Sequence, residues 1–260
     1  MEETMRLLDR ILSEGFNSVK PDEDVEQVQR KLEASQLVVI DNVADYTWGI
    51  LNYERKVNEI GDLIKVSDFP NVMLPFEQAF LEMRTPRFLQ VEECGVLMEM
   101  TKADALNLGE LNESLDRALQ IFRNGEAVYV LICSVFLYRR DFQKATEVAR
   151  FMLPVDAEGQ IVPLDDKFPV IGKVYARTEE SKVDEHVGAL MFLYLYLYPC
   201  FLALSFMHCR NVKVRTEQPP PKLSKKFQKK SGRPLLKYRV LMIDHVKQVL
   251  ESEGKAVQKA

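Results

Sequence analysis

Histidine, cysteine and tryptophan are scarce in this sequence, which has three, four and one of them. None of the three histidines has the spacing to a cysteine pair or a carboxylate that is typical of a metal site, so we predict no metal centre. The four cysteines are far apart and have apolar neighbours, unlike the dense disulfide framework of a small secreted protein. They indicate reduced and mostly buried thiols: Cys94, Cys133, Cys200 and Cys209.

The motifs of common enzyme classes are also missing. The sequence contains no P-loop, no GxGxxG, no GxSxG and no HExxH, and we expect no cofactor. Asp165-Asp166, followed by Lys167, is similar to the acid-plus-lysine groups of metal-dependent nucleases. Neighbouring residues of a strand point to opposite faces, so adjacency does not imply a shared metal, and solvated loop acids are favoured. His208 and Cys209 are likewise interpreted as helix-end residues rather than catalytic ones.

The N-terminus lacks the continuous apolar core of a signal peptide, because residues 1–15 carry six charged side chains. Their pattern predicts a short amphipathic helix instead, with Leu7, Leu8, Ile11 and Leu12 on one face and Gly15 as its end. We therefore expect a cytoplasmic protein.

The remaining composition is that of a globular protein, with 47% hydrophobic and 28% charged residues. We predict a single α+β domain over residues 1–260. Strand-like runs occur at 72–83, 88–100 and 127–138, and helical spacing occurs at 111–122. Because the strands follow one another along the chain, we expect an antiparallel sheet with helices packed on one face.

The longest uncharged segment, residues 187–207, has the length of a membrane-spanning helix and is followed by basic residues. Three tyrosines, at 194, 196 and 198, and Pro199 interrupt it, and no second candidate span exists. A long buried apolar helix of the core is the favoured interpretation, with a membrane anchor as the alternative, and a membrane is not an expected partner.

Negative charge is nearly absent from residues 210–239, which hold eleven Lys and Arg and one acid, Glu217. The net charge of the chain is −4, and residues 240–260 are balanced, so the first 209 residues carry −14 against +10 in this segment. The negative charge of the first 209 residues disfavours binding of nucleic acid by the whole surface, whereas one face of the basic segment has the charge to bind it.

The basic segment, residues 210–243, has the pattern of a strand, a helix and a second strand. Residues 211–216 alternate apolar and basic side chains, which predicts a strand with Val212 and Val214 inward. A proline triplet at 219–221 precedes the helix, and Gly232 and Pro234 end it. Five lysines recur at helical spacing and fall within an arc of about 140°. With Arg233 they form the predicted nucleic-acid site: Lys222, Lys225, Lys226, Lys229 and Lys230.

Several partners would satisfy these charges. Nucleic-acid phosphate is the favoured one, because its neutralisation releases condensed counterions. A host or phage protein with an acidic surface, or a solvated segment that only aids solubility, are the alternatives. Aromatic residues are sparse here, with Phe227 and Tyr238, so stacking on single-stranded bases is not indicated.

The same region resembles a group of uncharacterised proteins of bacteriophages and prophages. The resemblance covers residues 202–243 and rests on Asn211-Val212, Pro220, Lys222-Leu223, the block from Lys229 to Pro234, and Tyr238-Arg239-Val240. It implies a phage origin and the cytoplasm of an infected bacterium. The similar proteins continue beyond the last strand, which implies a further C-terminal part.

Together these features predict a non-enzymatic phage accessory protein that binds nucleic-acid backbone through a lysine-faced helix. A protein-interaction module or inhibitor of a host factor is the alternative, and a divalent-metal nuclease is the third possibility.

Overall fold

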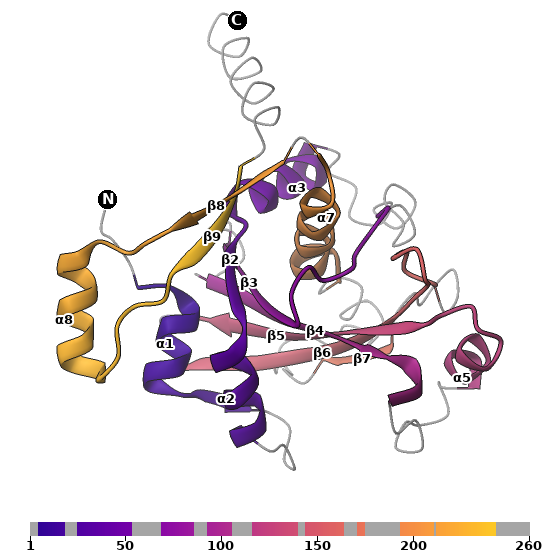
Figure 1. Ribbon diagram of the computed structural model, residues 1–260, viewed down its shortest axis with the longest axis horizontal. Coiled ribbons are helices and arrows are strands. Elements are labelled where there is room, and N and C mark those ends of the chain that lie inside the picture. Colours follow the sequence, from indigo (N-terminus) through magenta and orange to yellow (C-terminus); the bar gives the residue numbers. More distant parts are fainter. Residues whose placement is uncertain are drawn as a thin grey trace, which may run out of the picture.

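The structure is a computed structural model. It describes residues 5–18, 25–53, 69–85, 93–105, 116–139, 144–163, 171–174, 193–210 and 212–242. Nine strands within these residues form one sheet, in the order β1-β6-β5-β4-β3-β2-β9-β8, and β7 also pairs with β6 (Figure 1). The strands are β1 (Phe16–Ser18), β2 (Gln36–Val39), β3 (Gln78–Arg84), β4 (Glu93–Lys102), β5 (Tyr129–Tyr138), β6 (Ala145–Val155), β7 (Ile171–Val174), β8 (Lys213–Glu217) and β9 (Tyr238–Met242).

The sheet is mixed, so the prediction of a purely antiparallel sheet is wrong. Strands β3 to β6 are antiparallel neighbours, as expected for apolar runs that succeed one another. In contrast, β2 pairs in parallel with β3 and with β9, and β1 pairs in parallel with β6. The chain between β2 and β3 includes helix α3 (Asp41–Tyr53), and a parallel pair requires such a crossover.

Helices cover both faces of the sheet rather than one. Helices α1 (Leu7–Glu14) and α2 (Val25–Ala34) lie on one face, and α3 and α7 (Tyr198–Met207) lie on the other (Figure 1). Alternate residues of β3 show the division, since Ala79 and Leu81 belong to the α3/α7 core and Phe80 to the α1/α2 core. Strands buried on both faces read as continuous apolar runs, which concealed the second helical layer in the sequence.

The apolar segment enters this second layer. Its described part is a π-helical turn (Leu193–Leu197) that runs into the ten-residue α7, while 187–192 lies outside the described residues. The indole Nε1–H of Trp48 donates to the carbonyl of Leu195 at 3.0 Å, and Phe69 packs edge-on against Tyr198. The predicted single long apolar helix is therefore not present over 193–207. Among the described residues, no helix combines the length and hydropathy needed to cross a membrane.

Several other elements match the sequence prediction. Helix α1 ends at Gly15, whose φ of 77° is left-handed, and β5 lies within the strand-like run predicted at 127–138. Helix α5 (Asp116–Arg123) overlaps the predicted helix at 111–122 and ends one residue later, and residues 111–115 lie outside the described part.

Candidate functional site

The basic segment forms an extension of the sheet, residues 213–242, which we name the basic arm. Strands β8 and β9 pair antiparallel from Lys213 opposite Met242 to Glu217 opposite Tyr238. Helix α8 (Pro221–Ser231) connects them beyond the end of this hairpin and lies on the side of α1 (Figure 1). The predicted order of strand, helix and strand is confirmed. Val214 is not inward, however, because it is 41% exposed on the edge strand β8.

Helix α8 begins and ends where its sequence requires. Pro221 occupies the first turn, where its missing N–H leaves no hydrogen bond unmade. Gly232 follows the helix with a φ of 80°, a left-handed conformation that glycine adopts without strain, and its N–H donates to the carbonyl of Gln228 at 2.9 Å. These two ends fix the rotation of the helix relative to its connections.

The five predicted lysines all lie on exposed positions of α8. The opposite face is half-buried and consists of Leu223, Ser224, Phe227 and Ser231. Within the described residues, none of the five lysines forms an ion pair. Like charges four residues apart repel by a few tenths of a kcal/mol per pair, so the lysine face is a surface that an anionic partner would stabilise.

Contacts on the inner side hold α8 to residues 232–237, which we name the return loop. The Ser224 hydroxyl oxygen accepts the N–H of Leu235 at 3.2 Å, and the Ser231 hydroxyl is 3.1 Å from the carbonyl oxygen of Arg233, to which it donates. Leu235 is the buried residue of this loop, whereas α8 has none. The helix is thus positioned through the return loop rather than by a core of its own.

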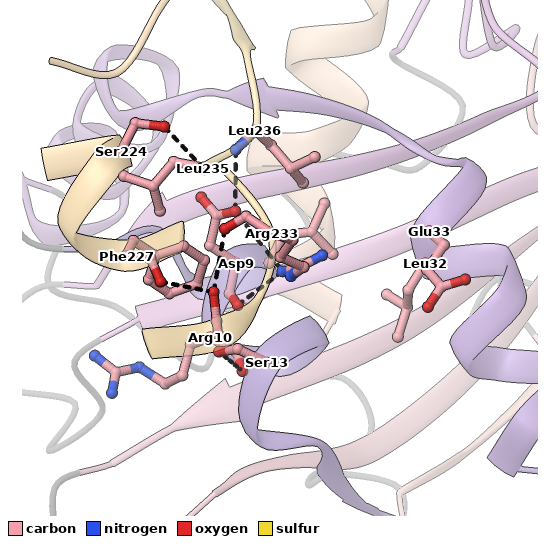
Figure 2. A network of polar contacts seen from close by, with 12 residues as sticks. Asp9, Arg10, Ser13, Leu32, Glu33, Ser224, Phe227, Arg233, Leu235 and Leu236 are labelled. Atoms are coloured by element: carbon pink, nitrogen blue, oxygen red, sulfur yellow. Dashed lines mark hydrogen bonds and ion pairs between the residues drawn. The ribbon is translucent and has the colours of Figure 1, made fainter. Parts of the chain in front are cut away.

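The return loop in turn is fastened to α1 by Asp9, a contact that spans most of the chain (Figure 2). Leu236 donates its N–H to Asp9 Oδ1 at 3.0 Å, and Arg233 Nη2 donates to the Asp9 carbonyl at 2.9 Å. The same Nη2 is 3.8 Å from Asp9 Oδ1. Arg233, predicted to contact nucleic acid beside the lysines, is thus placed on the inner side of the arm, 27% exposed.

Burial disfavours the ionised form of the Asp9 carboxyl group. Its pKa is raised to about 6 by desolvation, against the hydrogen bond from Leu236 and the attraction of Arg233 and Arg6. Burial also lowers the pKa of the Arg233 guanidinium, against the attraction of Asp9 and Glu33. Each group therefore bears a desolvation cost that the other only partly offsets.

Arg6 provides a second connection between the arm and the body. Its guanidinium carbon lies 4.8 Å from the ring centroid of Tyr238 in β9. Its Nη1 is 3.6 Å from Glu82 Oε1 in β3 and 3.7 Å from Asp41 Oδ2. This side chain therefore lies between β9 and two acids of the body.

Comparison with family models, with curated proteins and with solved structures finds no match to this chain.

The other candidate residues do not assemble into a reactive site in the described part of the chain. His208 Nε2 is 2.8 Å from the carbonyl of Met73, and the exposed Cys209 Sγ donates to the carbonyl of Ser205 at 3.4 Å. Cys94, Cys133 and Cys200 are buried, as predicted. No group of three metal-ligating side chains gathers among the described residues, and Asp165-Asp166 lies outside them.

Sequence reasoning found the lysines but missed Asp9. A lysine face is visible in the sequence because helical spacing is a local property. The Asp9 contact joins residues more than two hundred positions apart, and no local pattern marks it. Asp9 lies beside the apolar stripe of this short amphipathic helix, about 60° beyond Leu12 at 100° per residue, so helical spacing does not mark it as buried either.

Proposed function

We propose that this protein binds the phosphate backbone of nucleic acid through the lysine face of α8, without catalysis and without strong sequence readout. One observation carries the proposal. Five lysine side chains are exposed and unpaired among the described residues, on a helix whose opposite face is turned to the return loop. Phosphate groups would relieve the repulsion between these lysines and release counterions.

The side-chain chemistry of the face supports contact with phosphates rather than with bases. Lysine is a point charge, whereas base-edge recognition in the major groove mostly uses the planar, bidentate groups of Arg, Asn and Gln. Arg233 already donates to Asp9. Of the two aromatic residues in the arm, Phe227 lies on the inner face and Tyr238 is stacked on Arg6, which leaves no exposed platform for bases. We therefore expect the protein to bind duplex rather than single-stranded nucleic acid.

The length of the face suits a duplex. Lys222 and Lys230 are eight residues apart, which is about 12 Å along a helix at a rise of 1.5 Å per residue. This is similar to the width of about 12 Å of the B-DNA major groove. Lysines at the two ends of α8 are therefore spaced to reach different phosphates.

A titration with matched charge variants tests the proposal. Fluorescence anisotropy would compare duplex DNA and RNA binding to the native chain with two triple variants that lose the same charge. The first changes Lys222, Lys226 and Lys229 to Glu on α8, and the second changes the exposed Lys102, Arg123 and Lys144 to Glu elsewhere. We expect the α8 variant to lose at least tenfold in affinity and its log K against log salt slope to flatten by about 2.7, at 0.9 per phosphate. The control variant should change two- to threefold.

Two results would contradict the proposal. Equal losses in both variants would mean that only net charge matters, and a native chain that stays folded without binding either duplex would remove nucleic acid as the partner. Duplex incubated with Mg²⁺ or Mn²⁺ should also remain uncut, because cleavage would favour the nuclease alternative.

A protein partner is the second candidate, and the open edge of β8 favours it. Within the described residues β8 pairs with β9 alone and ends the strand order, and Lys213 to Thr216 are exposed. An extended acidic segment adding to this edge would protect the amides of 213–217 from hydrogen exchange. Nucleic acid on α8 would instead protect 221–231, so one exchange measurement distinguishes the two partners.

The setting is also a proposal. The resemblance of residues 202–243 to phage and prophage proteins supports an accessory protein that acts in the cytoplasm of an infected bacterium. Test duplexes of both phage and host sequence would then bind equally, because the lysine face reads charge.

A further inference from the structure

The basic arm touches the rest of the protein through few groups. Strand β9 pairs with β2 at Val38 and Val39, and Tyr238 lies against Arg6. Beyond Tyr238 towards α8, the polar contacts between the arm and the described part of the body are those of Asp9 with Arg233 and Leu236. Leu236 also packs against the α1/α2 core, so the polar contacts that orient α8 come from one residue of α1 and add to this apolar contact.

Asp9 is a buried acid whose carboxyl group is only partly hydrogen-bonded. It is 1% exposed, and two of its oxygens, Oδ1 and the backbone carbonyl, accept hydrogen bonds from the return loop. Its Oδ2 is buried without a hydrogen-bond partner among the described residues, and the same holds for Arg233 Nε. An unsatisfied oxygen of an ionised carboxylate is costly in a buried position, and a proton on Oδ2 would lower that cost.

We propose that Asp9 is the positioning residue of the basic arm: it fastens the return loop to α1, and protonation of its carboxyl group tightens this attachment. The positioning of the arm stands on the contacts above, and its consequence for binding rests on the proposed function.

The direction of the pH effect follows from linkage. In the docked arm the pKa of Asp9 is about 6, and in a released arm the exposed carboxyl group would titrate near the ordinary value of about 3.9. The docked state therefore binds the proton more tightly, so docking is strongest below pH 4 and weakens as the pH rises through 6. Between pH 7.5 and pH 5 the ratio of docked to released arm should rise about tenfold.

The charged groups around Asp9 modify this effect but do not reverse it. Arg233 of the return loop and Arg6 before α1 both favour the ionised carboxylate, and desolvation outweighs them. Glu33 of α2 acts on Arg233. Arg10 of α1 is directed elsewhere, since its guanidinium lies 4.2 Å from the ring centroid of Tyr138 and 3.7 Å from Glu14 Oε2.

Hydrogen exchange measured by mass spectrometry, without nucleic acid, tests the positioning role. Asp9→Ala should raise the exchange of residues 221–237 about tenfold at pH 7, while β5 at 129–138 stays protected. Asp9→Asn resembles the protonated carboxyl group, so it should keep the protection and lose the dependence on pH. Glu14→Ala, also on α1, is the matched control and should leave the arm unchanged. All rates are corrected for intrinsic exchange at each pH.

A variant on the arm side covers the case in which Asp9→Ala unfolds. Arg233→Gln removes the guanidinium without altering α1 and should loosen 221–237 selectively. The proposal is overturned if Asp9→Ala and Arg233→Gln both exchange as the native chain does, or if their exchange rises equally in β5 and in the arm. Native pH dependence in Asp9→Asn would overturn the role of the proton.

Duplex binding separates this proposal from the proposed function. If both hold, Asp9→Ala weakens binding severalfold without changing the salt slope, because the lysines that contact phosphates remain. A loosened arm with unchanged affinity would keep the attachment at Asp9 and overturn its consequence for binding. A native chain that binds no duplex, while Asp9→Ala still loosens the arm, would overturn the proposed function alone.

Discussion

At the scale of single residues, Gly95 shows how closely the α1/α2 core is packed. Gly95 lies in β4 opposite Glu82 of β3 and Phe136 of β5. The ring of Phe80 occupies the space that a side chain at Gly95 would need. Phe80 is itself completely buried, with its ring centroid 6.0 Å from that of Phe136. The glycine is therefore required by the ring that covers it rather than by backbone conformation.

We predict that Gly95→Ala destabilises the protein by about 1–3 kcal/mol, because overpacking a rigid core forces side chains from their preferred rotamers. Alanine ordinarily stabilises a strand relative to glycine, so the sign is diagnostic. Urea unfolding would measure the change. In a Phe80→Leu background the same substitution should cost less, and a double-mutant cycle without coupling between the two positions would contradict this account.

Glu82 places a second buried carboxyl group beneath the N-terminus of α1. Its Oε2 accepts the N–H of Leu8 at 3.2 Å, and Arg6 lies 3.6 Å from its Oε1. Complete burial nevertheless raises its pKa to about 8, with Arg6 and the helix N–H groups opposing the shift and Glu93 adding to it. The native state therefore retains a proton that the unfolded state releases near 4.5.

The stability that this proton contributes is present below pH 4.5 and is lost as the pH rises through 8. Glu82→Gln should remove this loss. Relative to the native chain, the variant should gain on the order of a few kcal/mol of unfolding free energy between pH 5 and pH 9. Urea titrations at pH 5, 7 and 9 measure the difference, in which the contribution of Asp9 cancels. Parallel stability profiles would show that Glu82 ionises normally in the fold.

At the scale of elements, two exposed glycines, one directly after a helix and one within a helix, should respond oppositely to substitution by alanine. Gly232 ends α8 in the left-handed conformation, with a φ of 80°. Gly49 lies within α3 at an ordinary helical φ, and a side chain at either position would meet no atom within 4 Å. The same substitution at the two sites therefore isolates the backbone term.

Gly232→Ala should destabilise the end of α8 by about 1 kcal/mol, because an L side chain is strained at this φ. Gly49→Ala should stabilise α3 by up to about 1 kcal/mol, because alanine is the better helix former. Hydrogen exchange at residues 221–232 and thermal unfolding would show the two effects. Changes of the same sign would mean that contacts, not backbone conformation, decide both positions.

Elements with strong local signals could be predicted from the sequence, and those held by distant contacts could not. The lysine face, Pro221 and Gly232 locate α8 within a residue or two. Strand β6 was missed because Glu147, Arg150 and Pro154 break its apolar pattern. Glu147 is buried, with Arg150 Nη2 at 2.7 Å from its Oε1. An Asp-Asn pair is typical of a turn, whereas here Asp41 begins α3 and its Oδ1 accepts the N–H of Arg84.

At the scale of the whole molecule, the sheet order depends on pairings that local patterns do not encode. Strand β9 pairs with β2, and β1 pairs with β6, across long stretches of chain. The prediction of an antiparallel sheet followed from chain order, which holds for β3 to β7 and for the pair of β8 and β9 but not for β1 and β2. The Asp9 contact belongs to the same class, since it exists only once β9 has joined β2 and brought the return loop to α1.

The geometry of the β8–β9 hairpin allows α8 to be deleted, which tests whether the sheet can fold without the binding surface. Glu217 and Tyr238 are directly paired, so residues 218–237 form a connection that a two-residue Asn-Gly turn can replace. Combined with Asp9→Asn, which avoids leaving a buried charge without Arg233, this deletion should keep the far-UV circular dichroism of the sheet and cooperative unfolding. It should abolish duplex binding that the native chain shows.

The Asp9→Asn chain with an intact arm is the control for this deletion. The loss of Leu235 and Leu236 from the interior should lower the unfolding free energy by about 2–4 kcal/mol, at 1.5–3 kcal/mol for each fully buried side chain and less for the half-buried Leu236. A shortened chain that folds and still binds duplex would move the binding surface away from α8. A shortened chain that does not fold would mean that the sheet needs the return loop. In that case β9 would pair with β2 only while the return loop is attached to α1.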